Sequence, residues 1–136
     1  TLDRSSAASD VYKRQGYVPV VAPLALGTHA ERLNVDGDRV AAFLAASLGA
    51  TTLLILSNVL GLLAEFPDEN SLVRHVAPSQ LDWAESLAQG RMKKKVLAAR
   101  EAFTGSVAQV ILADSRLAQP IRTALAGGGT WISQQP

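Results

Sequence analysis

A continuous apolar run, Thr52-Leu53-Leu54-Ile55-Leu56, constrains the fold of this chain more than any other segment. It has the length of a strand, and Gly49 separates it from a helical pattern before it. A strand that is apolar on both faces is buried on both faces, which is typical of parallel sheets covered by helices. The run therefore predicts an α/β domain.

Helical and strand patterns alternate along the rest of the chain. A helix is predicted from Asp36 or Asp38 to about Leu48, because apolar residues recur there at helical spacing. Its expected apolar face comprises Val40, Phe43, Leu44 and Leu48. The remaining predictions are strands over 18–22, 71–76, 107–112 and 130–132, a loop or hairpin over 24–33, and helices over 78–90, 92–103 and 120–125. This order predicts a three-layer sandwich with a mainly parallel sheet.

Composition limits the classes of function. A chain with 48% hydrophobic and 18% charged residues can build a core and is too apolar to be disordered. Its net charge of +1 argues against general nucleic-acid binding, which needs a broad basic surface. Cysteine is absent, which excludes disulfides and thiolate chemistry.

The apolar stretch from Val40 to Phe66 resembles a membrane span only superficially. Gly49, Thr51-Thr52 and Ser57-Asn58 interrupt it, so no run reaches the roughly 18 to 20 apolar residues that spanning requires. A helix followed by a buried strand explains it better. No apolar signal segment is visible near the N-terminus, and we expect a cytoplasmic protein without a membrane partner.

The first fifteen residues are interpreted separately from the domain. Asp10-Val11-Tyr12-Lys13-Arg14-Gln15 back-translates as GAT GTG TAT AAG AGA CAG, the end of a transposon adaptor used in sequencing libraries. We therefore interpret residues 1–15 as translated adaptor, in preference to a natural disordered tail, and expect the domain to occupy residues 16–136.

A lysine cluster is the first candidate for function. Gly90-Arg91-Met92-Lys93-Lys94-Lys95-Val96 opens the predicted helix 92–103, and helical spacing places Lys95 beside the apolar stripe, with Lys93 and Lys94 further toward solvent. A lysine at that border can place its ammonium in a cleft and neutralise a phosphoryl group. An ordinary basic helix face would show the same pattern, and periodicity alone leaves both interpretations open.

Other polar segments lie at predicted strand ends or helix starts. Asn34-Val35-Asp36-Gly37-Asp38 offers an amide and two carboxylates that cap a helix or orient a substrate and nearby lysines. Asp114 can touch a ribose or cap the next turn, and we favour the cap. Gly127-Gly128-Gly129 is interpreted as a flexible turn, since neither a P-loop nor a G-x-G-x-x-G motif is present. His29 is assigned no role.

In order, these segments resemble the C-terminal half of the amino-acid kinase family, to which acetylglutamate kinases belong. The resemblance covers 16–132 and rests on four motifs. They are N-x-[ND]-x-D at Asn34–Asp38, S-[DN]-x-x-G-[IL]-L at Ser57–Leu63, G-x-M-x-x-K-V at Gly90–Val96, and G-T-x-I at Gly129–Ile132. Asn58 and the three lysines are most similar to the branch that acts on aminoadipate or glutamate attached to the acidic carrier protein LysW.

The resemblance implies the following roles. Lys95 would stabilise the transferring γ-phosphoryl group, Asp38 would organise that lysine, and Asn34 would bind the substrate. ATP, with Mg²⁺ carried on its phosphates, would lie against Ser57, Asn58, Gly61, Leu62, Gly90 and Met92. The reaction would convert a side-chain carboxylate to an acyl phosphate in lysine or arginine biosynthesis. No protein-bound metal is expected, and the intact protein is expected to be a homo-oligomer.

Two alternatives stay open from the sequence. One is N-acetylglutamate kinase of arginine biosynthesis, which has the same chemistry and a small substrate. The other is a binding module that kept the fold and lost catalysis. The family's N-terminal lysine, glycine-rich turn and substrate-binding arginine have no counterpart in this sequence, so we expect the 136-residue chain to be inactive alone.

Overall fold

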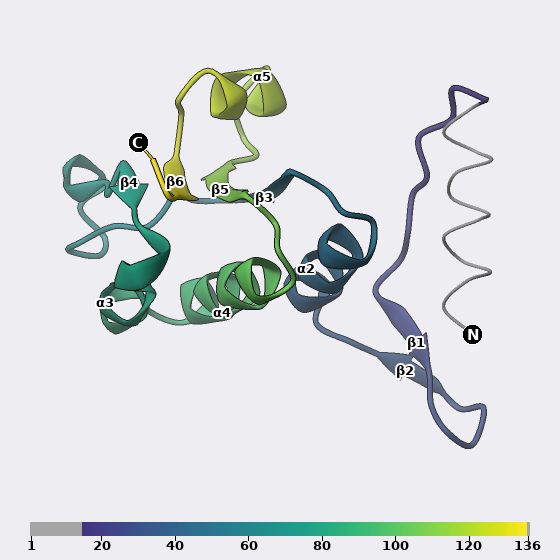
Figure 1. The fold of residues 1–136 in the computed structure, drawn as a ribbon. Coiled ribbons are helices and arrows are strands. Elements are labelled where there is room, and N and C mark those ends of the chain that lie inside the picture. Colours follow the sequence, from purple (N-terminus) through teal and green to yellow (C-terminus); the bar gives the residue numbers. More distant parts are fainter. Residues whose placement is uncertain (1–14, 136) are drawn as a thin grey trace. The chain divides into compact units, whose positions relative to one another are not determined.

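The computed structural model describes residues 15–135, and the chain divides into two compact units, residues 1–37 and 38–136. The interpretation of residues 1–15 as adaptor falls almost wholly outside the described residues. Within the first unit, β1 (Leu24–Leu26) and β2 (Arg32–Asn34) form an antiparallel hairpin, as expected for the segment 24–33 (Figure 1).

The strand predicted over Val18–Ala22 is wrong. Its residues adopt no strand, and Val20 is 95% exposed. The segment has strand-forming residues, but a strand needs a hydrogen-bonded neighbour. Among the described residues of the first unit, the only ladder is the hairpin formed by β1 and β2.

The second unit contains the sheet. Its strands are β3 (Thr52–Ser57), β4 (His75–Val76), β5 (Gln109–Asp114) and β6 (Thr130–Ser133), in the order β3-β5-β6-β4. The pairs β3–β5 and β4–β6 are parallel, whereas β5–β6 is antiparallel. The prediction of a mainly parallel sheet is therefore confirmed, with β6 as the reversed strand.

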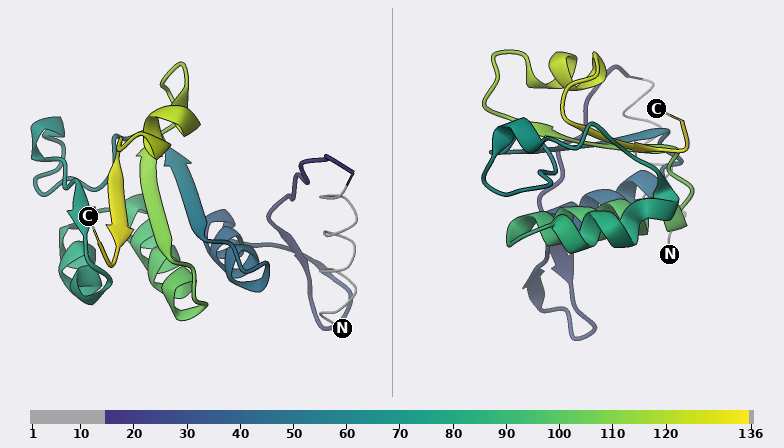
Figure 2. Two further views of the ribbon diagram at one scale, coloured as in Figure 1. Left: turned by 45° about the horizontal axis from the view of Figure 1, so that its top comes forward. Right: turned by 90° about the vertical axis from the view of Figure 1, so that its left-hand side faces the viewer.

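Helices cover both faces of this sheet. They are α2 (Gly37–Ser47), α3 (Leu81–Leu87), α4 (Arg91–Thr104) and α5 (Pro120–Leu125), with 3₁₀ turns at Glu69–Ser71 and Pro78–Gln80. Figure 2 shows α2, α3 and α4 on one face and α5 on the other, which is the predicted three-layer arrangement.

Successive side chains of the strands point alternately toward the helices on one face of the sheet and toward α5 on the other. Leu53, Ile55 and Val110 face the larger cluster, which includes Val96 and the alanines of α4, whereas Ile111 packs with α5. Because β3 lies at an edge of the described sheet, Leu54 and Leu56 stay half-buried, so burial of this strand on both faces is only partial. No helix among residues 15–135 is long and apolar enough to cross a bilayer.

The apolar face predicted for α2 is only partly correct. Ala42 and Ala45 are its buried residues, whereas Phe43 and Leu48 are exposed. The reason is close packing, because a Cβ on Gly105 at the end of α4 would lie 2.2 Å from Cβ of Ala46. Helices that approach this closely present small residues to each other, which turns the larger side chains outward.

The helix predicted over 78–90 ends earlier than expected. Pro78 begins a 3₁₀ turn that leads into α3, and α3 stops at Leu87 because Ala88 is extended. Gly90 is therefore the N-cap of α4 and does not end α3; its φ is 51°. This glycine lets the chain reverse between the two helices.

Candidate active site

A cavity of about 620 Å³ lies at the carboxyl end of β3 and the N-terminus of α4. Such crevices at strand carboxyl ends are the usual ligand sites of α/β sheets, and the volume suits a nucleotide-sized ligand. Fifteen residues line it: Leu56, Ser57, Asn58, Val59, Gly61, Leu62, Leu63, Phe66, Leu87, Ala88, Gln89, Gly90, Arg91, Met92 and Lys95.

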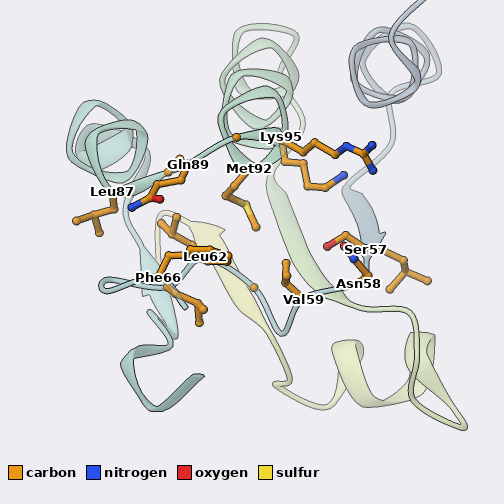
Figure 3. Close-up of a pocket in the computed structure, with 15 residues that line it drawn as sticks. Ser57, Asn58, Val59, Leu62, Phe66, Leu87, Gln89, Met92 and Lys95 are labelled. Atoms are coloured by element: carbon orange, nitrogen blue, oxygen red, sulfur yellow. The ribbon is translucent and has the colours of Figure 1, made fainter. Parts of the chain in front are cut away.

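The cavity has a polar end and an apolar end. Figure 3 shows Lys95 close to Ser57 and Asn58 at one end, with Leu87 and Phe66 at the other. Leu62 and Met92 lie between the two groups (Figure 3). Phe66 is 57% exposed, so a flat apolar group bound at that end would cover surface that is now open to water.

Lys95 forms an ion pair with Asp38. Its Nζ lies 2.9 Å from Oδ2 and 3.2 Å from Oδ1 of that carboxylate. The lysine side chain is only 14% exposed, because its stem lies beside the buried stripe of α4 that contains Val96. Asp38 sits in the first turn of α2, so the pair connects two helices and fixes where the ammonium lies.

The loop after β3 is anchored by a buried hydroxyl on β6. Thr130 Oγ1 accepts a hydrogen bond from the Leu62 N–H at 2.8 Å and donates one to the Val73 carbonyl at 2.6 Å. The Val73 N–H in turn donates to the Leu62 carbonyl. Gly61 permits this contact, since a Cβ there would lie 2.5 Å from Thr130 Oγ1. These bonds hold the loop 58–63 against the sheet.

The Ser57 hydroxyl is a buried polar group at the cavity. Its oxygen has no hydrogen-bond partner among the described residues, whereas its backbone carbonyl accepts bonds from Ser115. An unpaired buried hydroxyl is costly to the fold. A ligand in the cavity that offers an acceptor would satisfy it.

The start of α4 forms another wall. The Met92 N–H donates to the Gln89 carbonyl, and the helix begins at Arg91 after the left-handed Gly90. The first turn of a helix carries N–H groups without intrahelical partners and a partial positive charge. This wall therefore favours an anionic ligand.

Two other residues singled out in the sequence, Asn34 and Asp114, are not among the residues that line the cavity. Asn34 is on the exposed β2 of the first unit, opposite Leu24. Asp114 is 4% exposed, and the capping role is confirmed because its carboxylate accepts the Arg116 N–H at 2.8 Å. Hydrogen bonds from the Arg116 guanidinium hold the pKa of Asp114 below its ordinary value, against the opposite effect of burial.

Sequence reasoning missed several lining residues. Phe66, Leu87 and Gln89 border the cavity, and Thr130 supports the loop beside it. Thr130 belongs to the G-T-x-I motif, and this motif is the sequence signal that could have indicated its supporting role. Which of these residues reach the cavity depends on the direction in which the linker 88–90 enters α4. No local sequence pattern indicates that direction.

Within residues 15–135, no three His, Cys, Asp or Glu side chains gather closely enough to hold a metal ion. The cavity lining supplies hydroxyl, amide and cationic groups, which suit phosphate oxygens.

Residues 3–114 match the Amino acid kinase family. The chain belongs to this family. The resemblance drawn from the four motifs is thereby confirmed, and so is the fold that the resemblance implied.

Two relatives are similar over most of the chain. The [LysW]-aminoadipate kinase of Thermus thermophilus is 49% identical over 130 residues, which cover 94% of this chain and 48% of that protein. The [LysW]-aminoadipate kinase of Deinococcus radiodurans is 51% identical over 118 residues, which cover 87% of this chain and 40% of that protein. The chain thus spans about half or less of the length of these relatives.

Solved structures show the same fold. N-acetylglutamate synthase from Neisseria gonorrhoeae, complexed with coenzyme A and N-acetyl-glutamate, matches with a TM-score of 0.83 at 22% identity, covering 96% of this chain and 31% of that one. Carbamate kinase from Giardia lamblia bound to AMP-PNP matches with a TM-score of 0.61 at 29% identity, covering 76% and 34% of the two chains.

Proposed function

We propose that this chain supplies the ATP-binding part of a kinase that phosphorylates a side-chain carboxylate. The proposed acceptor is L-2-aminoadipate or glutamate attached to the carrier protein LysW, in lysine or arginine biosynthesis. The 49% and 51% identities to two [LysW]-aminoadipate kinases support this acceptor. The single observation that carries the proposed chemistry is the Lys95–Asp38 pair at the polar end of a nucleotide-sized cavity.

The cavity suggests how ATP lies. The base would occupy the apolar end between Phe66 and Leu87, which places the phosphates near Lys95. There the Ser57 hydroxyl would donate to a phosphate oxygen, and the first turn of α4 would add its partial positive charge. Mg²⁺ bound to the phosphates would neutralise part of their charge.

The reaction needs positioning and charge stabilisation from the protein. A carboxylate oxygen of the acceptor attacks the γ-phosphorus, the bond to the β,γ-bridging oxygen breaks, and ADP leaves with that electron pair. No proton has to move in this step. Lys95 would neutralise charge on the equatorial oxygens, and Asp38 would hold its ammonium in place before the reaction begins. Asn34 would hydrogen-bond the acceptor.

Activity of the complete protein tests the acceptor. Trapping the acyl phosphate with hydroxylamine should show turnover of carrier-bound aminoadipate or glutamate. Turnover of free N-acetylglutamate in its place would assign the protein to the acetylglutamate kinases, and no turnover of either would favour a binding module.

Replacing Lys95 tests the site. Lys95→Ala in the complete protein should lower turnover by about 10²- to 10³-fold, which is typical for loss of one transition-state contact. Lys93→Ala is the matched control, because Lys93 lies on the same helix, is exposed and does not line the cavity. Equal activity of the two variants would contradict the assignment. The 136-residue chain alone should bind ATP without turnover, and clear phosphoryl transfer by it would contradict that expectation.

A further inference from the structure

The charges around the cavity are unevenly compensated. Of the described residues that line it, two carry a charge, Lys95 and Arg91. Both oxygens of Asp38 accept from the Lys95 ammonium, so the pair as a whole is close to neutral. The uncompensated positive charge of the lining therefore belongs to Arg91.

Arg91 is placed to share a ligand with Lys95. It is the first residue of α4 and stands four residues before the lysine, so the two side chains lie on one face of the helix. Arg91 is exposed, and its side chain forms no ion pair with another described residue, whereas Arg39, Arg100 and Arg116 all do. A guanidinium at a cavity mouth without a carboxylate is free to bind an anion from solution.

The chemistry of the guanidinium narrows that anion. Its planar fork donates two parallel hydrogen bonds to a phosphate, which a lysine ammonium cannot match. The helix N-terminus and the unpaired Ser57 hydroxyl favour anionic acceptors in the same cavity. A chain of several phosphates can span both cations at once, which a single phosphate next to a nucleoside does less well.

We propose that Arg91 is a binding residue for the polyphosphate chain of the nucleotide and supports the preference for a triphosphate over a monophosphate. This inference rests on the proposed function, because it takes the cavity to be the ATP site. Lys95 then serves the transferring group, and Arg91 contributes mainly to affinity.

Calorimetric titration of the 136-residue chain tests the role of Arg91. The ligands are ATP, AMP and inorganic tripolyphosphate, and the variants are Arg91→Gln, Arg91→Lys and Lys93→Gln. Lys93→Gln is the control, because it removes one positive charge from the same helix turn at a residue that does not line the cavity. Circular dichroism melts establish that each variant is folded.

Arg91→Gln should weaken ATP and tripolyphosphate binding by roughly tenfold and change AMP binding less, because a charge-assisted hydrogen-bonded contact is lost. Lys93→Gln should change all three by less than about twofold, and Arg91→Lys should fall between wild type and Arg91→Gln. Salt should weaken ATP binding more in wild type than in Arg91→Gln.

The outcomes separate this inference from the proposed function. Equal losses for Arg91→Gln and Lys93→Gln, or an unchanged ratio of ATP to AMP affinity in Arg91→Gln, would overturn the role of Arg91. If wild type binds tripolyphosphate through Arg91 but binds ATP no more tightly than tripolyphosphate, the nucleoside adds nothing. The proposed nucleotide site then fails, and the anion-binding role of Arg91 stands. If wild type binds neither ATP nor tripolyphosphate, both the proposed nucleotide site and the proposed role of Arg91 are overturned.

Discussion

Thr130 offers the sharpest test of how the fold builds the cavity. Its buried hydroxyl accepts from the Leu62 N–H and donates to the Val73 carbonyl, and both residues adjoin the loop that borders the site. Thr130→Val keeps the shape of the side chain and removes both bonds. The Leu62 N–H then stays buried without an acceptor, since Leu62 is only 1% exposed.

The size of the effect follows from these contacts. A buried donor left without an acceptor costs about 1–3 kcal/mol, and the carbonyl that loses its donor adds a smaller amount. Together we expect Thr130→Val to lower the free energy of unfolding by about 2–4 kcal/mol. Thr130→Ser keeps the hydroxyl and loses one methyl group, which costs about 1 kcal/mol. The serine variant is therefore the control.

Urea unfolding of the 136-residue chain, followed by tryptophan fluorescence and circular dichroism, measures this difference. Thr130→Val should unfold at a clearly lower urea concentration than Thr130→Ser. Hydrogen exchange at the Leu62 amide should also accelerate in the valine variant, because its acceptor is gone. If the valine and serine variants unfold at the same urea concentration with equally slow exchange at Leu62, the hydroxyl does not anchor the loop and the reasoning is refuted.

Three further predictions concern Gly61, Asp114 and Asp38. Gly61→Ala should destabilise the chain by about 2 kcal/mol or more and weaken ATP binding, because its Cβ would lie 2.5 Å from Thr130 Oγ1; urea unfolding and calorimetry measure the two effects. Asp114→Asn should lower the melting temperature near pH 7. Since Arg116 lowers the pKa of Asp114 in the folded chain, the ionised carboxylate stabilises the fold above about pH 4 and loses that effect as the pH falls through the lowered pKa; the melting curves of wild type and variant should therefore converge in acid. Asp38→Asn in the complete protein should lower turnover by about tenfold or more with a smaller change in the KM for ATP, because it loosens the position of Lys95 and keeps its charge; steady-state kinetics separates the two parameters.

Local patterns predicted most of the second unit. The apolar run of β3, the helical spacing in α4, and Pro120 at the start of α5 each determine structure through neighbours in sequence. The segment 18–22 shows the limit of such patterns. A strand exists only with a partner, and strand-forming residues alone do not supply one. The exposed Phe43 shows a second limit, because close helix packing selected alanines over larger side chains.

The sequence predicts individual residues of the candidate site but not how they are arranged in space. Lys95 was placed at the border of the apolar stripe by helical spacing, and the structure puts it there with Asp38 as its partner. Arg91 lies between Gly90 and Met92, which were both predicted to border ATP, but no role for its side chain follows from the sequence alone. Its position at the cavity depends on Gly90, whose φ of 51° sets the direction in which α4 begins. A positive φ at a single glycine leaves no periodic signal in the sequence.

The pairing of Lys95 with Asp38 explains why one cavity would need two cations. An ammonium that already has a carboxylate partner attracts a bound anion less than a free ammonium does, so the pair would contribute little to the proposed ground-state affinity for ATP. Its position is fixed in advance, however, and a fixed charge stabilises a transition state without the cost of reorganising. Affinity would then come from a cation that has no carboxylate partner among residues 15–135, and Arg91 at the same wall is such a cation. On this argument, loss of Arg91 should raise the KM for ATP in the complete protein and leave kcat nearly unchanged, whereas loss of Lys95 should lower kcat.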